Sequence, residues 1–595
     1  MYRKIISIIK IMVVWLTAFS SSGQAPSTYC NPVNIDYGYT PIPGMTSSGK
    51  HRATADPVIV NYKGDFYLFS TNQWGYWWSN DMYNWHFKSR KFLRSWNTGT
   101  YDDLCAPGVG IIGDTMIVFG STYTRTFSIW MSTNPKENDW KVLVDSFDIG
   151  GWDPAFFTDD DGKFYMYNGS SNVYPLYGIE LNRKTMQPIG TRKEIHLLKP
   201  WRYGWQRFGE HLDNTFLDPF MEGAWMTKHN GLYYLQYGAP GTEFSGYADG
   251  VAVADGPLGT PLGNFQDQSD PLSLKMGGYA KGAGHGSTFQ DNNGNWWHVS
   301  TIRISVKNNF ERRIGIWPAG FDQDDVMWCN TAFGDYPHKL PYAIEDQPLN
   351  YGDGFTGWML LNYNKPIQVS STLGGFHANN ANNEDIKTYW SAKTGDKGEW
   401  IMTDLGDIST VNAIQINYAD QDVADDHLGK INDGAQYHQY IIYASGNGKK
   451  WHVLVDKSKN KTDVPHDYIE LDQPYQTRYL KLENIHMPTG KFAISGLRVF
   501  GKGQGKKPDT VESFIVLRTE KDKRSAWIKW NPVNNAYAYN IYYGTDPNRL
   551  YTCFMVYDDN EYWFKSMDSR KTYYFTIESV NENGVSEKYK TIEVK

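Results

Sequence analysis

The sequence contains little cysteine and no surplus of positive charge. Its four cysteines among 595 residues are too few for a disulfide-rich scaffold and too scattered for a zinc site. One disulfide bridge remains open among the first three: Cys30, Cys105 and Cys329. Acidic residues number 65 and basic residues 58, so the formal net charge is −7. This balance argues against the basic surface that nucleic-acid-binding proteins use, and we expect no nucleic-acid partner.

Long apolar runs are also missing. A helix that crosses a bilayer needs about 20 consecutive apolar residues, and no segment of the chain reaches that length. Residues 1–24 instead resemble a signal peptide, because Arg3 and Lys4 precede an apolar stretch from Ile11 to Phe19 and small residues follow. We therefore expect no membrane span and an exported protein, secreted or periplasmic, with attachment to the cell surface left open.

Aromatic residues are abundant. They make up 16% of the chain, with 23 tryptophans and 42 tyrosines, whereas charged residues account for an ordinary 21%. Such a composition favours β-structure and flat surfaces on which rings can stack. It excludes a coiled coil, a helical bundle and a disordered chain, and we expect an all-β protein.

A strand pair with a glycine-containing turn recurs five times between residues 50 and 320. In each copy the second strand alternates aromatic and aliphatic residues. The intervals between successive turn glycines, 49 to 69 residues, exceed the ~40–45 residues of a minimal four-stranded blade and leave room for functional loops. The repeats predict a five-bladed β-propeller, with turns at Gly64, Gly113, Gly162, Gly231 and Gly294.

The first strand of four repeats begins with an ionisable residue. Asp56, Asp153, Glu222 and His285 each stand eight or nine residues before a turn glycine, and the remaining repeat has Cys105-Ala-Pro at that place. One such carboxylate alone would be an ordinary turn residue. Four in register, each followed by an apolar strand, are costly unless they are paired or functional. Since the first strand of a blade lines the central channel, we expect the four side chains to converge in one site.

These residues resemble the motifs of glycoside hydrolase family 43 over roughly residues 28 to 345. The family has an Asp-Pro in the first blade, a Trp/His-Asp-Pro in the third and a Glu-Gly in the fourth, and all three occur here in order. The resemblance implies that Asp56 is the general base, that Glu222 is the general acid, and that Asp153 orients the acid and raises its pKa. It further implies that His285 reaches a structural calcium or a water network on the propeller axis, with no cofactor required for the chemistry.

The resemblance implies a secreted, inverting exo-glycosidase that takes an oligo- or polysaccharide substrate, and we expect a monomer. It leaves β-D-xylose, α-L-arabinofuranose and galactose-type sugars open. The alternatives are a catalytically inactive, multivalent glycan-binding protein and an adhesion protein built from the C-terminal modules. Trp74, Trp77 and Trp152 are candidates for stacking on the sugar, in competition with core packing. Arg312 is a candidate for binding sugar hydroxyls, in competition with a salt bridge.

After Pro341 the pattern changes to shorter strands and Asn-rich loops. Residues 350–502 resemble a discoidin-like domain of the coagulation-factor type, which either binds glycans or only packs against a catalytic neighbour. A Gly/Lys-rich linker from Gly501 separates it from residues 508–595, which resemble a fibronectin type III domain with Tyr573 as the tyrosine corner. The expected organisation is a signal peptide at 1–24, a five-bladed β-propeller at 25–345 and two C-terminal β-sandwich domains.

Overall fold

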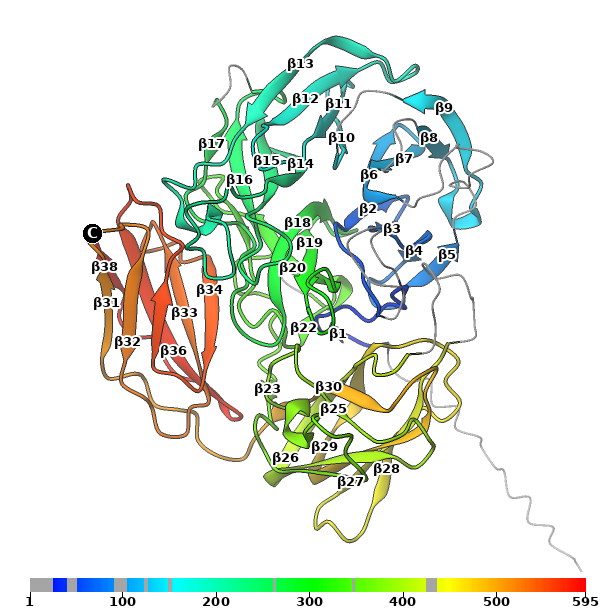
Figure 1. Cartoon of the computed structure of the whole chain (residues 1–595), viewed down its shortest axis with the longest axis vertical. Helices are drawn as coiled ribbons and strands as arrows, with labels where there is room; N and C mark the ends of the chain where they lie inside the picture. The colour runs from blue at the N-terminus through cyan, green and yellow to red at the C-terminus, as the bar shows by residue number, and fades with distance from the viewer. Residues whose placement is uncertain are drawn as a thin grey trace, which may run out of the picture.

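The computed structural model describes residues 25–39, 51–89, 104–121, 127–147, 152–259, 264–344, 348–423 and 436–595. Within these residues the secondary structure consists of strands and four short 3-10 turns, with no α-helix. Three β-rich bodies are visible in Figure 1: a ring of sheets, a sandwich below it and a second sandwich beside it. The all-β expectation is confirmed.

The ring is a five-bladed propeller. Each blade is a four-stranded antiparallel sheet in simple chain order, and the innermost strands of neighbouring blades contact one another around the centre. The strands are β2 (Val58–Tyr62), β3 (Asp65–Phe69), β4 (Gly75–Ser79) and β5 (His86–Ser89) in blade 1; β6 (Cys105–Ile112), β7 (Thr115–Ser121), β8 (Phe127–Ser132) and β9 (Lys141–Phe147) in blade 2; β10 (Ala155–Thr158), β11 (Phe164–Asn168), β12 (Leu176–Leu181) and β13 (Pro188–His196) in blade 3; β14 (Glu222–His229), β15 (Leu232–Ala239), β16 (Ala248–Ala254) and β17 (Gln266–Asp267) in blade 4; and β18 (Lys281–Gln290), β19 (Trp296–Arg303), β20 (Arg312–Phe321) and β21 (Met327–Cys329) in blade 5.

The turn glycines explain the hairpins that open each blade. All five expected glycines have a positive φ, and each stands between the first and second strands of its blade. In blade 4, Asn230 and Gly231 both have positive φ, and His229 pairs with Leu232 across them. A two-residue turn of this kind matches the twist of the flanking strands. The expectation of five repeats is confirmed.

The N-terminal segment contacts both the last blade of the propeller and the first sandwich. β1 (Thr28–Tyr29) pairs with β22 (His338–Lys339), and the amide of Val33 donates a hydrogen bond to the carbonyl oxygen of Ile314 in β20. The side chain of Glu470, in the first sandwich, accepts hydrogen bonds from the amide of Thr28 and the hydroxyl of Ser27. The segment therefore ties the propeller to the sandwich that follows it.

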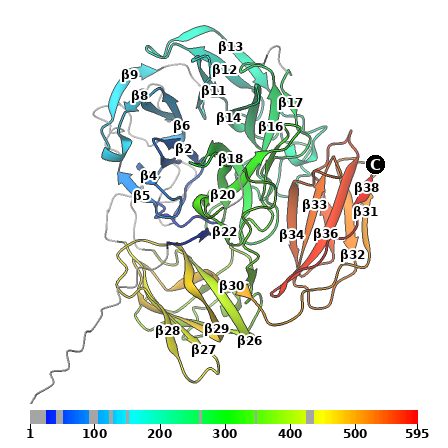
Figure 2. The ribbon, with the colours of Figure 1, turned by 180° about the vertical axis from the view of Figure 1, so that it is seen from behind.

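The first sandwich contains one eight-stranded sheet system. Six strands follow the order β23-β30-β26-β29-β27-β28, and the other two, β24 and β25, pair with β26 and β30. Two of its strands, β26 and β29, are long and pair with each other along most of their length. The sandwich lies below the propeller in Figures 1 and 2. Its strands are β23 (Met359–Leu360), β24 (Ile367–Val369), β25 (Trp390–Ser391), β26 (Trp400–Tyr418), β27 (Gln439–Ser445), β28 (His452–Asp456), β29 (His466–His486) and β30 (Ala493–Lys502).

The last module packs a three-stranded sheet, β31-β32-β35, against a sheet built on β34-β33-β36-β37, with β38 paired to β36. Tyr573, at the start of β36, accepts a hydrogen bond from the amide of Asp568 at 2.7 Å, which is the geometry of a tyrosine corner. The strands are β31 (Phe514–Arg518), β32 (Ala526–Trp530), β33 (Ala538–Gly544), β34 (Thr552–Tyr557), β35 (Glu561–Phe564), β36 (Tyr573–Asn581), β37 (Gly584–Val585) and β38 (Ile592–Val594).

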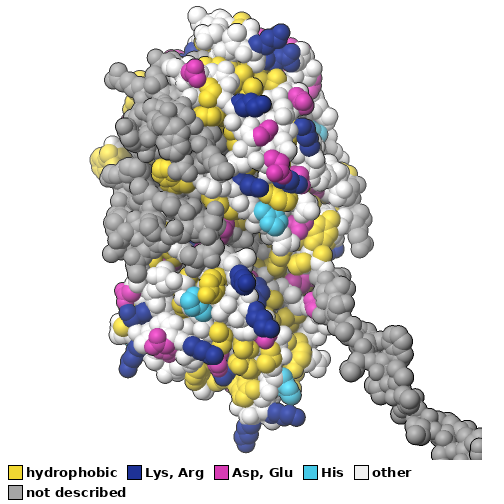
Figure 3. All heavy atoms as spheres, turned by 90° about the vertical axis from the view of Figure 1, so that its right-hand side faces the viewer, with side chains coloured by type: hydrophobic (Ala, Val, Ile, Leu, Met, Phe, Trp, Pro, Cys, Tyr) yellow, Lys and Arg dark blue, Asp and Glu magenta, His cyan; other side chains and the backbone are white. Residues whose placement is uncertain are grey.

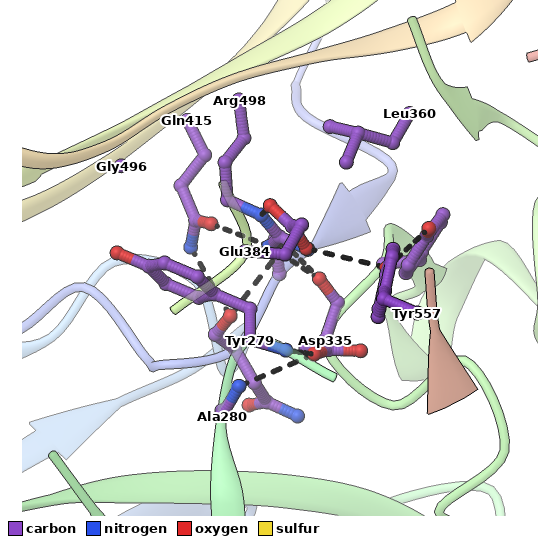
Figure 4. Close-up of polar contacts among 12 residues, drawn as sticks. Tyr279, Ala280, Asp335, Leu360, Glu384, Gln415, Gly496, Arg498 and Tyr557 are labelled. Atoms are coloured by element: carbon purple, nitrogen blue, oxygen red, sulfur yellow. Dashed lines mark hydrogen bonds and ion pairs between the residues drawn. The ribbon is translucent and has the colours of Figure 1, made fainter. Parts of the chain in front are cut away.

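A buried charge network joins the three bodies. Arg498 of β30 is fully buried and forms two hydrogen bonds with the Glu384 carboxylate, at 2.9 and 2.8 Å. It also donates to the main-chain oxygen of Asp335 from the propeller, and Tyr557 of the last module lies beside Glu384 (Figure 4). A hydrophobic cluster around this network draws residues from all three bodies, so the modules share a core at this junction.

This network leads to a stability prediction. Removing one partner of a buried ion pair leaves the other charge uncompensated, which costs about 3–5 kcal/mol, whereas an exposed pair contributes about 0–1 kcal/mol. We expect Arg498→Met to lower the midpoint of the first thermal transition by roughly 10 °C. The matched control is Arg478→Met, because Arg478 forms a bidentate pair with Asp404 in the same sandwich but is 38% exposed. Equal shifts in the two variants would show that the buried network contributes no more than a surface pair.

The structure also bears on the cysteines and on the expected absence of a membrane span. All four cysteines are free and buried, so the bridge left open among the first three does not form. No helix among the described residues is long and apolar enough to cross a membrane. The expected signal peptide lies outside the described residues.

On the face shown in Figure 3, the described basic and acidic side chains are interspersed rather than gathered by sign.

Candidate active site

The innermost strands of all five blades share an unusual backbone conformation at one position, which lies shortly before the strand or within its first half. Asp56, Ala106, Asp153, Gly223 and His285 have φ angles of 54°, 43°, 56°, 66° and 47°. A left-handed conformation at a non-glycine residue costs about 1–3 kcal/mol and persists where the surroundings enforce it, often at functional sites. The same left-handed conformation is therefore imposed at the equivalent position of every blade, at the centre of the propeller.

Hydroxyl groups from neighbouring blades hold these positions. The amides of Asp56, Ala106 and Asp153 donate to the side-chain oxygens of Thr301, Thr71 and Ser121, at 2.9, 2.8 and 2.7 Å. Each hydroxyl lies within two residues of the end of the second strand of the preceding blade. The contacts link one blade to the next and fix the backbone at these three positions.

The structure corrects the register of the fourth blade. Gly223, not Glu222, occupies the equivalent position, and Glu222 is one residue earlier, at the start of β14. A Cβ on Gly223 would lie 2.6 Å from two ring atoms of His285, so only glycine permits this close approach. The Glu-Gly pair thus supplies a carboxylate and the space for the histidine beside it.

Asp56 is surrounded by groups that stabilise its charge. Thr71 donates a hydrogen bond to its Oδ2 at 2.5 Å, and Nδ1 of His285 is 3.2 Å from its Oδ1. Nη1 of Arg312 is 3.9 Å from the same oxygen. Asp56 is nearly buried, with 8% of its surface exposed, so these contacts offset much of its loss of solvation.

Glu222 has the opposite environment. Burial first, and then the negative charges of Asp153 and Asp56, raise the pKa of Glu222 well above its ordinary range, although His285 opposes this effect. The hydroxyl of Tyr247 donates to its Oε1 at 2.5 Å, which leaves Oε2 available to carry a proton. A carboxyl group held in this way remains protonated near neutral pH.

Asp153 lies between the other acidic groups. Burial raises the pKa of Asp153, the charge of Asp56 raises it further, and His285 partly opposes the shift. Ligand atoms of Asp153, Glu222 and His285 all lie within 4.8 Å of one another. Asp153 and Glu222 therefore titrate as a coupled pair, and an ionised Asp153 favours the protonated form of Glu222.

His285 connects the three carboxylates. Burial alone would lower its pKa, but the charges of Asp56, Asp153 and Glu222 outweigh burial and raise the pKa of His285. The amide of the next residue, Gly286, donates to Asp249, which also contacts His298 in a fully buried pair. This pair supports the backbone of β18 beneath the histidine.

The described side chains at the centre supply only part of the ligand set that the expected calcium would take. Calcium takes six to eight oxygen ligands. The described residues gather one nitrogen and two carboxylates here, and Tyr247 and His285 already contact the carboxylates of the site. The calcium remains a prediction, and no step of the chemistry below depends on it.

The candidate sugar-binding residues lie in different places. Trp77 is fully buried, packs against Phe87, and donates its indole N–H to Asp36, so its assignment as a sugar contact is wrong. Because side chains alternate along β4, Trp77 packs in the cluster that blade 1 shares with blade 5 and the N-terminal segment, whereas Tyr76 packs in the cluster shared with blade 2. Trp152 directly precedes Asp153 and is 37% exposed, and Trp74 is half-buried in the loop after β3. Arg312 lies in the site and is buried, with Nη1 donating to Thr242 at 2.7 Å.

Sequence reasoning missed several residues of the site. Thr71, Ser121 and Thr301 carry a detectable signal, because a small hydroxyl residue stands within two residues of the end of the second strand in these blades. Tyr247 is part of the segment Gly246-Tyr-Ala-Asp-Gly that supported the family resemblance, but its contact with Glu222 depends on tertiary structure. In the second blade, the Cys105-Ala-Pro departure places only the methyl group of Ala106 at the equivalent position.

The centre of the five-bladed propeller thus gathers two buried carboxylates and one half-buried carboxylate, the kind of acid–base set that glycoside hydrolases use on O-glycosyl bonds. Residues 50–327 match the family model "Glycosyl hydrolases family 43". Residues 366–495 match the model "F5/8 type C domain", so a discoidin-like domain follows the propeller.

Comparison with individual proteins gives more distant similarities. Over 139 residues the chain is 29% identical to the Beta-D-galactofuranosidase xynD of Aspergillus niger, a match that covers 23% of this chain and 33% of that protein. A thermostable family-43 glycoside hydrolase structure shows 22% identity and a TM-score of 0.40, covering 51% of this chain and 96% of that one. A xylan beta-1,4-xylosidase structure from Bacillus halodurans shows 13% identity and a TM-score of 0.40, covering 80% and 100%.

Proposed function

We propose that the protein is an exported, inverting exo-glycosidase that removes a terminal sugar from an oligo- or polysaccharide. The observation that carries this proposal is the contrast among three converging carboxylates. Asp56 faces Thr71, His285 and Arg312, all of which favour a carboxylate, whereas burial and neighbouring negative charges favour the protonated form of Glu222. A base and an acid in one pocket are what hydrolysis with inversion requires.

The proposed reaction is a single displacement. Asp56 accepts a proton from a water molecule, and the water oxygen forms a bond to the anomeric carbon as the bond to the leaving oxygen breaks. Glu222 gives its proton to that leaving oxygen, so the products are a free sugar of opposite configuration and an alcohol. Arg312 and His285 stabilise ionised Asp56 before the step, and Asp153 keeps Glu222 protonated.

The proposed function leaves three types of terminal sugar to be distinguished. The curated relative named above is a galactofuranosidase, so aryl β-D-galactofuranoside is the first substrate to test, beside aryl β-D-xyloside and aryl α-L-arabinofuranoside. We expect turnover of one of the three, and only monosaccharide as the first product from the matching oligosaccharide. If the folded protein bound these sugars but turned over none of them or their oligosaccharides, the alternative of an inactive glycan-binding protein would be favoured.

The other modules serve mainly to hold the catalytic domain. The shared core and the Arg498 network show that the discoidin-like domain packs firmly against the propeller, and glycan binding by its loops remains a proposal. We propose that the last module is of the fibronectin type III kind, which its strand order and the Tyr573 corner support. The export proposal rests on the character of residues 1–24.

The role of Asp153 leads to a pH prediction. Because its negative charge raises the pKa of Glu222, replacing it by neutral asparagine makes the acid easier to ionise. We expect the alkaline limb of the kcat/KM profile of Asp153→Asn to move about one pH unit lower, while burial keeps it above the ordinary Glu range. The control is Asp159→Asn, a buried aspartate at the far end of the same strand that pairs with Lys228. An unchanged alkaline limb in Asp153→Asn would remove Asp153 from this role.

A further inference from the structure

Two loops beside Glu222 expose large apolar side chains. Phe216 is 97% exposed and Tyr174 67% exposed, and each has an exposed aliphatic neighbour, Leu217 and Val173. One loop connects β11 to β12, and the other connects β13 to β14. Exposed apolar groups gathered in this way mark binding surfaces more often than chance.

The two loops are joined to each other next to the catalytic acid. Ser171 and Met221 exchange two main-chain hydrogen bonds of 3.0 Å, and Met221 directly precedes Glu222. The side-chain amide of Asn172 donates to the main-chain oxygen of Asp218 at 2.8 Å. At the base of the first loop, the amide of Gly169 donates to the carbonyl oxygen of Trp152, the neighbour of Asp153. The two loops that carry the apolar side chains are thus joined at residues next to Glu222 and Asp153, and none of these contacts involves a partner of Asp56.

Both loops present their apolar pair in the same way. The hydroxyl oxygen of Ser171 accepts the amides of Val173 and Tyr174, each at 3.0 Å. The side-chain oxygen of Asn214 accepts the amides of Phe216 and Leu217, at 2.9 and 3.1 Å. These local bonds fix the backbone of each pair, so the side chains are presented with little loss of main-chain entropy on binding.

We propose that Tyr174, Phe216 and their neighbours form the subsite for the leaving group, and that this leaving group is itself a sugar residue of a longer chain. The inference rests on the proposed function, because Glu222 must face the leaving oxygen to protonate it. The group attached to that oxygen then lies over the loops next to Glu222. Aromatic and aliphatic side chains suit the C–H face of a sugar ring, whereas they offer no charge to an anionic leaving group.

The test compares two substrates of the same sugar: an oligosaccharide, whose leaving group fills the subsite, and a glycosyl fluoride, whose leaving group is one atom. For the double variant Tyr174→Ala/Phe216→Ala we expect the ratio of kcat/KM on the oligosaccharide to kcat/KM on the fluoride to fall at least about tenfold, which corresponds to about 1.4 kcal/mol. The control is Ile189→Ala, a half-exposed apolar residue on the outer strand β13, which should leave the ratio unchanged.

The outcomes separate this inference from the proposed function. If the wild-type protein hydrolyses both substrates and the double variant keeps the wild-type ratio, the loops do not bind the leaving group and the inference is overturned. If the wild-type protein hydrolyses neither substrate of any of the three candidate sugars, the proposed function itself fails. Thermal unfolding of the double variant should match the wild type, because both replaced side chains are exposed.

Discussion

Asp56→Asn is expected to lower kcat by about 10²–10⁴-fold on every glycoside that the protein hydrolyses, because general base catalysis contributes an effect of this order. Asparagine keeps the size of the side chain and can still meet Thr71, but it cannot accept the proton of the attacking water. No other carboxylate described in the site shares the contacts of Asp56 with both Arg312 and His285.

The control for this variant is Asp65→Asn. Asp65 begins the second strand of the same blade and pairs with Lys136 at the partly exposed edge, away from the central contacts. We expect full activity from it and a folded state in both variants, measured by circular dichroism and thermal unfolding. A decrease of less than tenfold in Asp56→Asn would assign the base to another group.

Glu222→Gln is expected to lower kcat/KM by about 10²–10⁴-fold on substrates with a sugar leaving group, because such alkoxides leave slowly without a proton. A dinitrophenyl leaving group needs little protonation, so the loss on an aryl glycoside of that kind should be much smaller. The measurement is the ratio of the two losses in one variant, which cancels any effect on folding.

A control for Glu222→Gln is Glu210→Gln. Glu210 is a partly exposed carboxylate that accepts hydrogen bonds from Ser245, in the loop after β15, and from Arg303, at the end of β19. None of its described contacts involves the three central acids. We expect Glu210→Gln to lower kcat/KM by the same small factor on both substrates. Equal losses on both leaving groups in Glu222→Gln would mean that Glu222 does not act as the acid.

The local features of the fold could be predicted from the sequence. The turn glycines and the alternating strands are set by short-range backbone preferences, so Gly64 and Gly231 identify their hairpins without tertiary information. The carboxylates could be found because the propeller repeats the same position in each blade. The one-residue shift at Glu222 was missed because only the positive φ of Gly223 reveals the true register.

Contacts between distant segments could not be predicted. The burial of Trp77 depends on which face of β4 meets the N-terminal segment, and a strand of several aromatics does not indicate this. The Arg498 network joins residues more than a hundred positions apart, and its charged side chains look like surface residues in the sequence. The same is true of Tyr247, whose role depends on the loop that brings it to Glu222.

The most direct test of the account is the configuration of the sugar at the moment of release. A proton NMR time course with the best aryl glycoside should show the anomer opposite to that of the substrate first, and the other anomer only as mutarotation proceeds. This result is expected because Asp56 activates water and forms no bond to the sugar. First release of the same anomer as the substrate would mean that a carboxylate attacks the sugar, and it would contradict the assignment of Asp56 as a base.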